Sequence, residues 1–310
     1  MSGKEGKLNI LMLCANQNEK YNWGHQLFRN ALGRQHNVTY YGEGYPKFGI
    51  VSVPKILERI KMVPDVIITH HWRQARVFTD LDKITDIPKI HIAIDHYPGN
   101  RRYETHSILF KSHKYDMVVS RTGPEYECAK NNPAAPKLQL LLPYGIELQR
   151  YRKMPNLTKE FDVMASWNKT LSAYPRRRRV HSMLQSMNIR TYIKLCYHQS
   201  YVNNINRSRI FVNSNNRCGA SNQKFTEVLA CGTCFLSEVP VDSGIYGFIP
   251  GYHYAVFDGV QDMKKKILYL LGHPNVREEI AVNGMKFVRE NHSNDVRVKE
   301  FTDVIREKLL

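Results

Sequence analysis

Two cysteines, Cys231 and Cys234, have the C-x-x-C spacing that is used by redox centres and by zinc sites. A structural zinc ion takes four ligands, and the other cysteines stand alone in the sequence. A redox pair lies at the start of a helix, where a thiolate is stabilised. Here the order is reversed, because residues 222–230 have a helical pattern, Gly232 suits a helix C-cap and residues 233–238 resemble a strand. The sequence therefore favours a structural role for both thiols.

A run of four arginines, residues 176–179, follows Pro175, which suits the first position of a helix. Cations there oppose the helix dipole, at a cost of about a few tenths of a kcal/mol each. A bound anion would reverse this cost, so the run predicts a phosphate site that includes Lys169 and Arg176. A solvated basic face, a nuclear-localisation signal and a nucleic-acid contact are the alternatives that this pattern leaves open.

Three polar residues follow predicted strands in the first half of the chain and could act on a hydroxyl group. Asp95 and His96 come at the end of one apolar segment, and His70 comes at the end of another. At the rim of a cleft, a carboxylate or an imidazole can serve as a base or can orient a hydroxyl. An aspartate after a strand is also a common turn former, and a histidine there is often structural, so both interpretations stay open.

The elements that must position these residues alternate between strands and helices. Short runs rich in Ile and Val are typical of strands buried on both faces of a parallel sheet. The predicted strands are residues 8–15, 65–71, 89–95, 115–120, 138–143, 161–166, 189–196, 208–214, 233–238 and 254–258. The predicted helices are residues 23–35, 52–64, 176–187, 223–231, 260–272 and 275–291. This alternation predicts an α/β protein of doubly wound, Rossmann-like domains.

The pattern restarts after a polar, proline-bearing segment at residues 142–160, which predicts two lobes with a cleft between them. We expect one domain at residues 1–148, a second at 149–292 and an amphipathic C-terminal helix at 293–310. The chain of 310 residues is long enough for two domains of ordinary size.

Composition narrows the class of partner. The formal net charge of +17 favours an acidic partner such as nucleic acid, an anionic membrane face or a phosphorylated small molecule. Six cysteines are too few for a secreted disulfide scaffold. The apolar run near the N-terminus is too short for a signal peptide, and no run is long enough for a transmembrane segment. We therefore expect a cytoplasmic protein with reduced thiols.

The segment TEVLACGTCFLS, residues 226–237, is similar to the nucleotide-sugar lobe of GT-B glycosyltransferases, whose usual form is Glu-Ala-x-Ala-Cys-Gly-x-Pro-Val. Cys234 stands where that family usually has proline. With Lys224 three residues before Glu227, the segment resembles the CgeB-like (spore-maturation) branch of the glycosyltransferase group 1 type. Further segments with this resemblance, in the order of the family, are residues 141–151, 161–168 and 276–293.

The resemblance implies a GT-B fold in which residues 1–148 bind the acceptor, residues 149–292 bind the nucleotide sugar and the last helix packs back on the first domain. It implies that Glu227 accepts hydrogen bonds from the ribose hydroxyls and that Lys224 lies near the phosphates. The other candidates for donor binding are Ser166, Asn168, Lys169, Tyr174, Arg176, Asn222, Gly232 and Thr233. The candidate catalytic residues on the acceptor side are Asp95, His96 and His70.

One position departs from the larger family. Relatives with paired glutamates have a second acid eight residues before the ribose-binding one, and here that position is Gly219. The contacts to the donor sugar therefore cannot be copied from those enzymes. We expect backbone N–H groups and amides such as Asn222 to replace them.

The expected reaction is metal-independent hexosyl transfer from a UDP-linked donor, with no cofactor and, by resemblance, with retention. Basic side chains and a helix N-terminus would stabilise the charge that develops on the leaving phosphate. The acceptor could be DNA, an anionic glycan or a lipid carrier at a membrane surface. The alternatives are a phage-type glycosyltransferase acting on a hydroxymethylated DNA base and a non-catalytic protein that binds nucleotides or nucleic acid.

Overall fold

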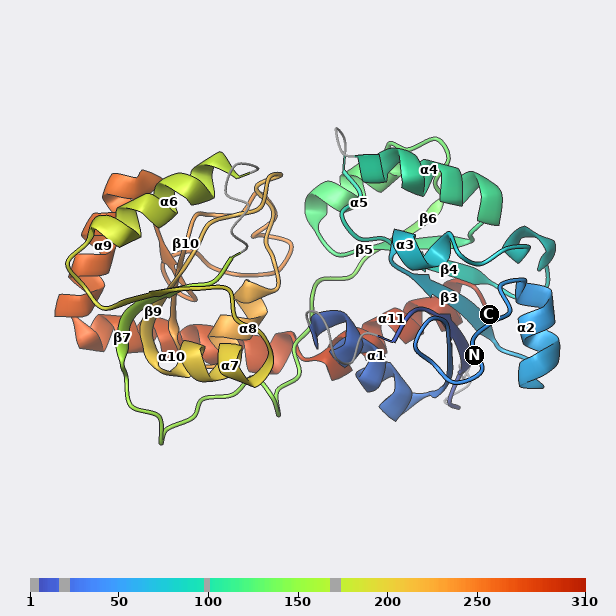
Figure 1. Cartoon of the computed structure of the whole chain (residues 1–310), viewed down its shortest axis with the longest axis horizontal. Coiled ribbons are helices and arrows are strands. Elements are labelled where there is room, and N and C mark those ends of the chain that lie inside the picture. Colours follow the sequence, from blue (N-terminus) through green and yellow to red (C-terminus); the bar gives the residue numbers. More distant parts are fainter. Residues whose placement is uncertain (1–5, 17–22, 98–100, 168–173) are drawn as a thin grey trace. The chain divides into compact units, whose positions relative to one another are not determined.

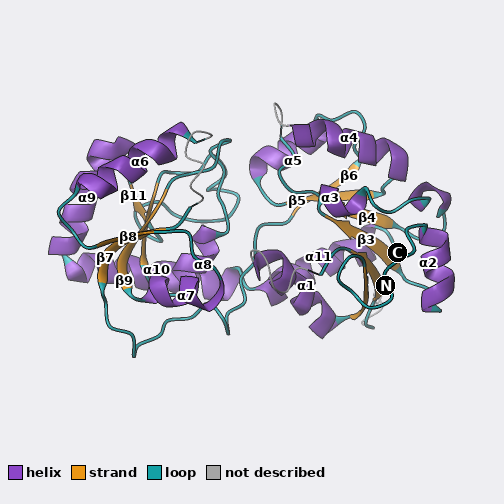
Figure 2. Cartoon of the chain, in the orientation of Figure 1, coloured by secondary structure: helices purple, strands orange, loops and turns teal. Residues whose placement is uncertain are grey.

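The computed structural model describes residues 6–16, 23–97, 101–167 and 174–310 (Figure 1). The chain divides into two compact units. The first comprises Met1–Pro143 together with Asp295–Leu310, and the second comprises Tyr144–Asn294. Each unit has its own parallel sheet with helices on its faces (Figure 2), so the predicted fold class of two Rossmann-like α/β units is confirmed.

The first unit contains a six-stranded sheet in the order β2-β1-β3-β4-β5-β6. All neighbouring strands are parallel. Every residue of β3, β4 and β5 is buried, as the apolar runs predict for strands covered on both faces. The strands are β1 (Asn9–Leu13), β2 (Asn37–Tyr41), β3 (Val66–His70), β4 (Lys89–Ile92), β5 (Met117–Ser120) and β6 (Leu138–Leu141).

The helices of this unit pack on both faces of the sheet and enclose two apolar clusters. They are α1 (Trp23–Gln35), α2 (Val53–Ile60), α3 (Trp72–Ala75), the 3-10 helix η1 (Leu81–Lys83), α4 (Arg101–His113), α5 (Gly123–Lys130) and, from the end of the chain, α11 (Asn294–Lys308). Val298, Phe301 and Ile305 of α11 are fully buried in the cluster that also contains Phe28 of α1. The rings of Phe28 and Phe301 lie 6.1 Å apart. The end of the chain thus completes the core of the first unit.

The second unit contains a five-stranded parallel sheet in the order β11-β10-β9-β7-β8. From β7 the chain goes to the edge strand β8, and it then returns to the other side of β7 to form β9. The carboxyl ends of strands beside such a reversal form the usual ligand-binding crevice of open α/β sheets. The strands are β7 (Phe161–Ala165), β8 (Thr191–Ile193), β9 (Ser208–Asn213), β10 (Cys234–Ser237) and β11 (Ala255–Val256).

Helices cover both faces of this second sheet (Figure 1). Val180 and Leu184 of α6 share an apolar cluster with Met263 and Ile267 of α9 on one face. On the other face, α8 contacts both β10 and α10. The helices are α6 (Pro175–Ser186), α7 (His198–Asn206), α8 (Lys224–Ala230), α9 (Gly259–Gly272) and α10 (Pro274–Asn291).

The Cys-x-x-Cys segment has the predicted order of helix, cap and strand. Cys231 is the C-cap residue of α8, and Gly232 has the left-handed φ of +65° that favours glycine after a helix. Cys234 begins β10, and both cysteines are free and buried. Burial raises the pKa of the Cys231 thiol and raises that of Cys234 to about 12, so both stay protonated at neutral pH.

Gly284 lies where α10 passes close to a neighbouring backbone. A Cβ added there would stand 2.2 Å from the carbonyl oxygen of His253 and 2.7 Å from Cδ2 of Leu229. We expect Gly284→Ala to lower the free energy of unfolding by about 1–3 kcal/mol in urea denaturation, because the packed neighbours must move. Gly272→Ala is the matched control, since nothing lies within 4 Å of its added Cβ. Equal stability of the two variants would contradict the close contact.

Candidate functional site

Glu227 places a buried carboxylate in the first turn of α8. The Tyr201 hydroxyl donates a hydrogen bond to its Oε2 over 3.0 Å, and the Tyr151 hydroxyl donates to its Oε1 over 3.5 Å. Burial raises the pKa of Glu227, whereas the charge of Lys224 and the two hydroxyl donors lower it. Burial and the neighbouring carboxylate raise the pKa of both tyrosines well above the usual value, so both keep their donor protons. Each carboxylate oxygen also has a second lone pair that can accept a ligand hydroxyl.

Lys224 begins the same helix and lies one turn before Glu227. Asn222 caps this end, because its Oδ1 accepts the backbone N–H of Lys224 over 3.0 Å. Its Nδ2 donates to Oδ1 of Asn213, the last residue of β9, over 3.4 Å. Burial lowers the pKa of Lys224 to about 8, against the opposing effect of Glu227. The start of α8 thus offers the ammonium group of Lys224 to an anion, whereas the backbone N–H groups of Lys224 and Phe225 are bonded to Asn222.

The arginine run forms the first turn of α6, with Pro175 at the predicted first position. No acidic residue lies in that turn. Arg177 is partly buried, and its guanidinium lies 4.3 Å from the ring centroid of Tyr174, the N-cap residue. The side chains of Arg176 and Arg179, three residues apart, are exposed and line the same pocket. Within the run, Arg177 therefore contacts an aromatic ring, whereas Arg176 and Arg179 form part of a pocket wall.

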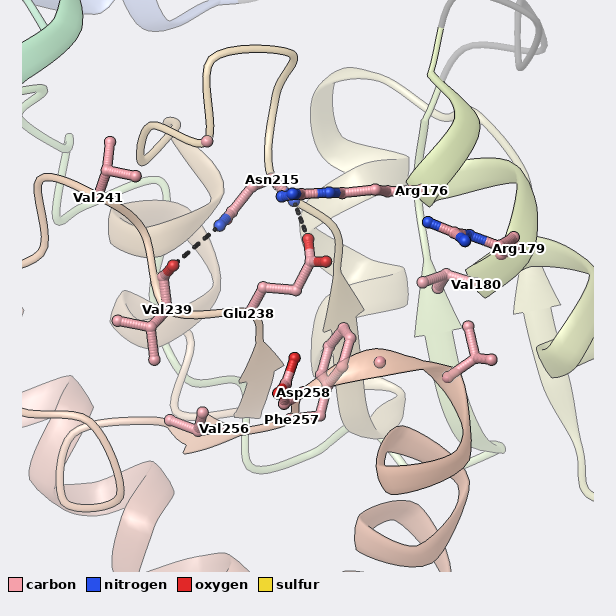
Figure 3. Close-up of a pocket in the computed structure, with 13 residues that line it drawn as sticks. Arg176, Arg179, Val180, Asn215, Glu238, Val239, Val241, Val256, Phe257 and Asp258 are labelled. Atoms are coloured by element: carbon pink, nitrogen blue, oxygen red, sulfur yellow. Dashed lines mark hydrogen bonds between the residues drawn. The ribbon is translucent and has the colours of Figure 1, made fainter.

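This pocket has a volume of about 790 Å³ and opens at the carboxyl ends of β9, β10 and β11 (Figure 3). Asn215 and Glu238 follow β9 and β10 and enter it beside Arg176. The Asn215 backbone N–H donates to Oε2 of Glu238 over 3.0 Å, and its side-chain Nδ2 donates to the Val239 carbonyl over 3.3 Å. The Ser214 hydroxyl adds a bond of 3.2 Å to the same Glu238 oxygen. Gly219 lines the wall as well.

The other predicted donor-binding residues occupy different places. Ser166 is buried just after β7, with its hydroxyl 4.0 Å from the Cys196 sulfur. Gly232 and Thr233 precede β10, at its amino end, and the Thr233 hydroxyl donates to the Ile205 carbonyl over 2.8 Å. The structure therefore does not bring these two to the carboxyl ends of the strands. Asn168 and Lys169 lie outside the described residues.

Asp95 follows β4 in the first unit and has a left-handed φ of 59°. Its carboxylate forms an ion pair with Arg102 and accepts the Tyr97 hydroxyl over 3.3 Å. Its backbone N–H donates to Oε1 of the buried Glu125 over 2.6 Å. Burial raises the pKa of Glu125 to about 7, against hydrogen bonds from Arg121 and Thr122. The Asp95 carboxylate is partly exposed and is held by Arg102 and Tyr97, while Glu125 holds the backbone of the same residue.

His96 does not lie at a rim, as the sequence predicts, but inside the first unit, where it is 0% exposed. Its ring stacks on Tyr103 at 5.3 Å, and Asn132 Nδ2 lies 3.4 Å from its Nε2. Burial lowers its pKa to about 4. The segment after β4 turns inward under α4, and this turn buries the imidazole directly after the exposed aspartate.

His70 ends β3 and is also buried. Its ring meets the edge of His25 at 4.9 Å, and burial lowers its pKa well below the usual value. Its Nε2 has no hydrogen-bond partner among the residues that the structure describes. His70 is thus a neutral imidazole with an unused ring nitrogen, and its catalytic role stays a prediction.

A family model described as glycosyl transferase-like matches residues 149–303. The chain belongs to this glycosyl transferase-like family. The matched residues include Glu227, Lys224 and the pocket at the carboxyl ends of β9, β10 and β11. A search among curated protein sequences found no significant match.

Solved structures with the GT-B fold of glycosyltransferases are similar to the whole chain. Anabaena HepE in complex with UDP-glucose has a TM-score of 0.76 at 9% identity, and the match covers 97% of this chain and 100% of that one. Sucrose-phosphate synthase from Thermosynechococcus elongatus has a TM-score of 0.66 at 13% identity, with coverage of 97% and 99%. An alpha-glucosyltransferase in complex with UDP-glucose and DNA containing an abasic site has a TM-score of 0.64 at 13% identity, with coverage of 97% and 100%.

Several polar residues of the second unit that lie in the site are not among those predicted from the sequence. Asn215 directly follows the predicted strand at 208–214 and Glu238 ends the predicted strand at 233–238, so the carboxyl-end rule could have found them. Tyr151 and Tyr201 carry no such signal, because they lie 76 and 26 residues from the carboxylate that they contact. Their role depends on the tertiary fold alone.

Two further properties concern the described residues only. They contain no group of three or more His, Cys, Asp or Glu side chains that could hold a metal ion. None of their helices is long and apolar enough to cross a membrane.

Proposed function

We propose that this protein transfers a sugar from a nucleotide-sugar donor to an acceptor hydroxyl group. The observation that carries the proposal is the Glu227 carboxylate at the start of α8, buried and held by the hydroxyls of Tyr201 and Tyr151. A buried carboxylate with free lone pairs is suited to a vicinal diol such as that of ribose. Membership of the glycosyl transferase-like family supports the same activity.

In the proposed site, Glu227 binds the ribose hydroxyls and the start of α8 faces the phosphates. Lys224 neutralises the charge that grows on the departing diphosphate, and Arg176 contributes from α6. These groups are positioned before the reaction, so they stabilise the transition state without reorganising at that moment. We propose that this stabilisation makes the transfer independent of a metal ion, which is tested by unchanged turnover in EDTA.

We propose UDP as the nucleotide and a hexose as the sugar. Structures with a similar fold are described as complexes with UDP-glucose, which supports this choice. We also propose retention of anomeric configuration, by resemblance to the larger family, and an origin in the CgeB-like branch, on the basis of Lys224 three residues before Glu227. The configuration of the product is checked by NMR.

The test is a screen of nucleotide sugars for hydrolysis without acceptor, together with thermal shifts in UDP. At a concentration of a hundred times Kd, a ligand adds about 2.7 kcal/mol of stability. We expect UDP to stabilise the wild type and the control Glu290→Ala, an exposed acid of α10, but not Glu227→Ala. No stabilisation of the wild type by any nucleotide would contradict the proposal. Binding without hydrolysis or transfer would leave a non-catalytic nucleotide-binding protein.

For the acceptor, we propose an anionic molecule, because the net charge is +17 and the excess is spread over both halves of the chain. Asp95 is the proposed acceptor-side residue, since its carboxylate is partly exposed whereas the His96 imidazole and the Glu125 carboxylate beside it are buried. Counterion release makes contact with a polyanion strongly salt-dependent. Transfer to a hydroxymethylated DNA duplex that falls steeply with salt would identify DNA as the acceptor. Transfer only to a glycan or lipid carrier would exclude it.

A further inference from the structure

Gly219 occupies the position where paired-glutamate glycosyltransferases have a second acid, and its backbone explains why this chain has none there. Its φ of +71° favours glycine, and an added Cβ would lie 3.2 Å from Cγ1 of Val241. A glutamate at this position would therefore be strained. Gly219 nevertheless lines the pocket at the ends of β9, β10 and β11, and that pocket has a carboxylate from another element.

That carboxylate belongs to Glu238, directly after β10. Its Oε2 accepts two donors, the Ser214 hydroxyl and the Asn215 backbone N–H. Its Oε1 forms no hydrogen bond to another residue that the structure describes. The two bonds on one oxygen fix the carboxylate at the pocket wall and leave the other oxygen available as an acceptor.

Asn215 contributes a second acceptor to the same wall. The residue is 4% exposed, and its Oδ1 has no hydrogen-bond partner among the described residues. The unpaired amide atom is the oxygen, because the amide nitrogen donates to the Val239 carbonyl over 3.3 Å. A buried acceptor without a donor is costly unless a ligand or water satisfies it.

The remainder of the wall has the character of a sugar site. Val180, Val239, Val241 and Phe257 provide apolar surface for the C–H face of a sugar ring, and Arg176 and Arg179 provide donors. The volume of about 790 Å³ lies within the range of small-molecule sites and is ample for one hexose. Two neighbouring acceptors beside an apolar face match hydroxyl groups rather than a phosphate, which accepts but does not donate.

We infer that Glu238 and Asn215 recognise the hydroxyls of the transferred sugar, and that Glu238 supplies from the end of β10 the carboxylate that position 219 lacks. The inference rests on the proposed function and deepens it. It replaces the expectation that backbone N–H groups and Asn222 hold the sugar, because the Asn222 amide is used on Lys224 and Asn213.

The test compares two ligands by titration calorimetry, UDP alone and the UDP-sugar that the wild type hydrolyses fastest. In Glu238→Gln, an amide donor replaces one acceptor oxygen, and the other oxygen can still hold Asn215. We expect the affinity for the UDP-sugar to fall about 10- to 100-fold, the range for hydrogen bonds to a charged group, with UDP affinity changed less than about 2-fold. Asn215→Ala should also lower the affinity for the UDP-sugar. Glu279→Gln, which changes an exposed acid of α10, should change the affinity for neither ligand.

Three other results would each overturn the inference. Equal losses for both ligands, with unchanged melting temperature, would assign Glu238 to the nucleotide. Unchanged affinity for both ligands in Glu238→Gln would exclude it from recognition. A wild type that binds no nucleotide and no nucleotide sugar would overturn the proposed function itself, and the inference with it.

Discussion

Replacement of Lys224 by methionine is expected to lower kcat by about 10²- to 10³-fold, the usual cost of removing one group that stabilises developing charge. The aliphatic stem is largely kept, so packing at the start of α8 changes little. Lys265→Met on the exposed side of α9 is the matched control and should leave kcat unchanged. Equal activity of the two variants would exclude Lys224 from the reaction.

The same residue predicts an alkaline limit of activity. Burial lowers the pKa of Lys224 to about 8, so the amine is cationic below that pH and neutral above it. Accordingly, kcat/KM should be constant below pH 8 and fall about tenfold per pH unit above it, because this ratio reports the free enzyme. Lys224→Arg should remove the limit, since a guanidinium stays charged. A wild-type profile that is flat to about pH 9.5 would contradict the assignment.

Mild acid is expected to unfold the first unit, because its interior contains neutral histidines. His91 Nδ1 lies 2.7 Å from the Thr69 hydroxyl, and its Nε2 lies 3.2 Å from Nδ1 of His106. His106 Nε2 then lies 3.2 Å from the Ile94 carbonyl, which can only accept. His106 therefore donates there, and burial is what favours the neutral form of both rings, because it lowers the pKa of His106 and of His91.

The direction of the pH effect follows from these pKa values. Burial lowers the pKa of His106 to about 3 and of His96 to about 4, and it lowers that of His91 well below the usual value. Unfolded histidine binds a proton near pH 6.5, so the unfolded state takes up protons first as the pH falls. Stability is fully present above pH 6.5 and is lost below it by about 1.4 kcal/mol per pH unit for each such histidine.

Hydrogen exchange measured by mass spectrometry between pH 7 and pH 4.5 checks this expectation unit by unit. Amides of β3, β4 and β5 should lose protection as the pH falls, with a slope of several protons, because burial also lowers the pKa of His70 and His25, whereas the raised pKa of Glu125 opposes this effect. His106→Phe should reduce the slope by about one proton, whereas His273→Gln, exposed in the second unit, should leave it unchanged. A first unit whose protection does not depend on pH in this range would show that the buried rings accept protons without unfolding.

The fold could be predicted in outline because its central strands are continuous apolar runs. The missed elements lacked that signal. β2 is only partly buried, and α7 carries asparagines and a glutamine among its few apolar residues. The predicted strand at 189–196 is reduced to three residues because β8 lies at the edge of its sheet.

The candidate site could be predicted only where a local motif marks it. The spacing of Lys224 and Glu227 identified the start of α8, yet nothing local revealed Tyr151 and Tyr201 as partners. The sequence predicts the same position for Asp95 and His96, at the end of one strand. In the structure, however, the Asp95 carboxylate is partly exposed and the His96 imidazole is buried. Burial of adjacent loop residues depends on how the loop turns, which periodicity does not encode.

The burial of α11 in the first unit has a consequence for synthesis of the chain. Phe28 packs against Phe301 of α11, so the core of the first unit stays incomplete until α11 has left the ribosome. Domains otherwise tend to fold in the order in which they are made. Here the continuous second unit can complete its fold first. Until then, the nascent first unit exposes the apolar surface that Val298, Phe301 and Ile305 finally cover, and exposed surface of this kind favours aggregation.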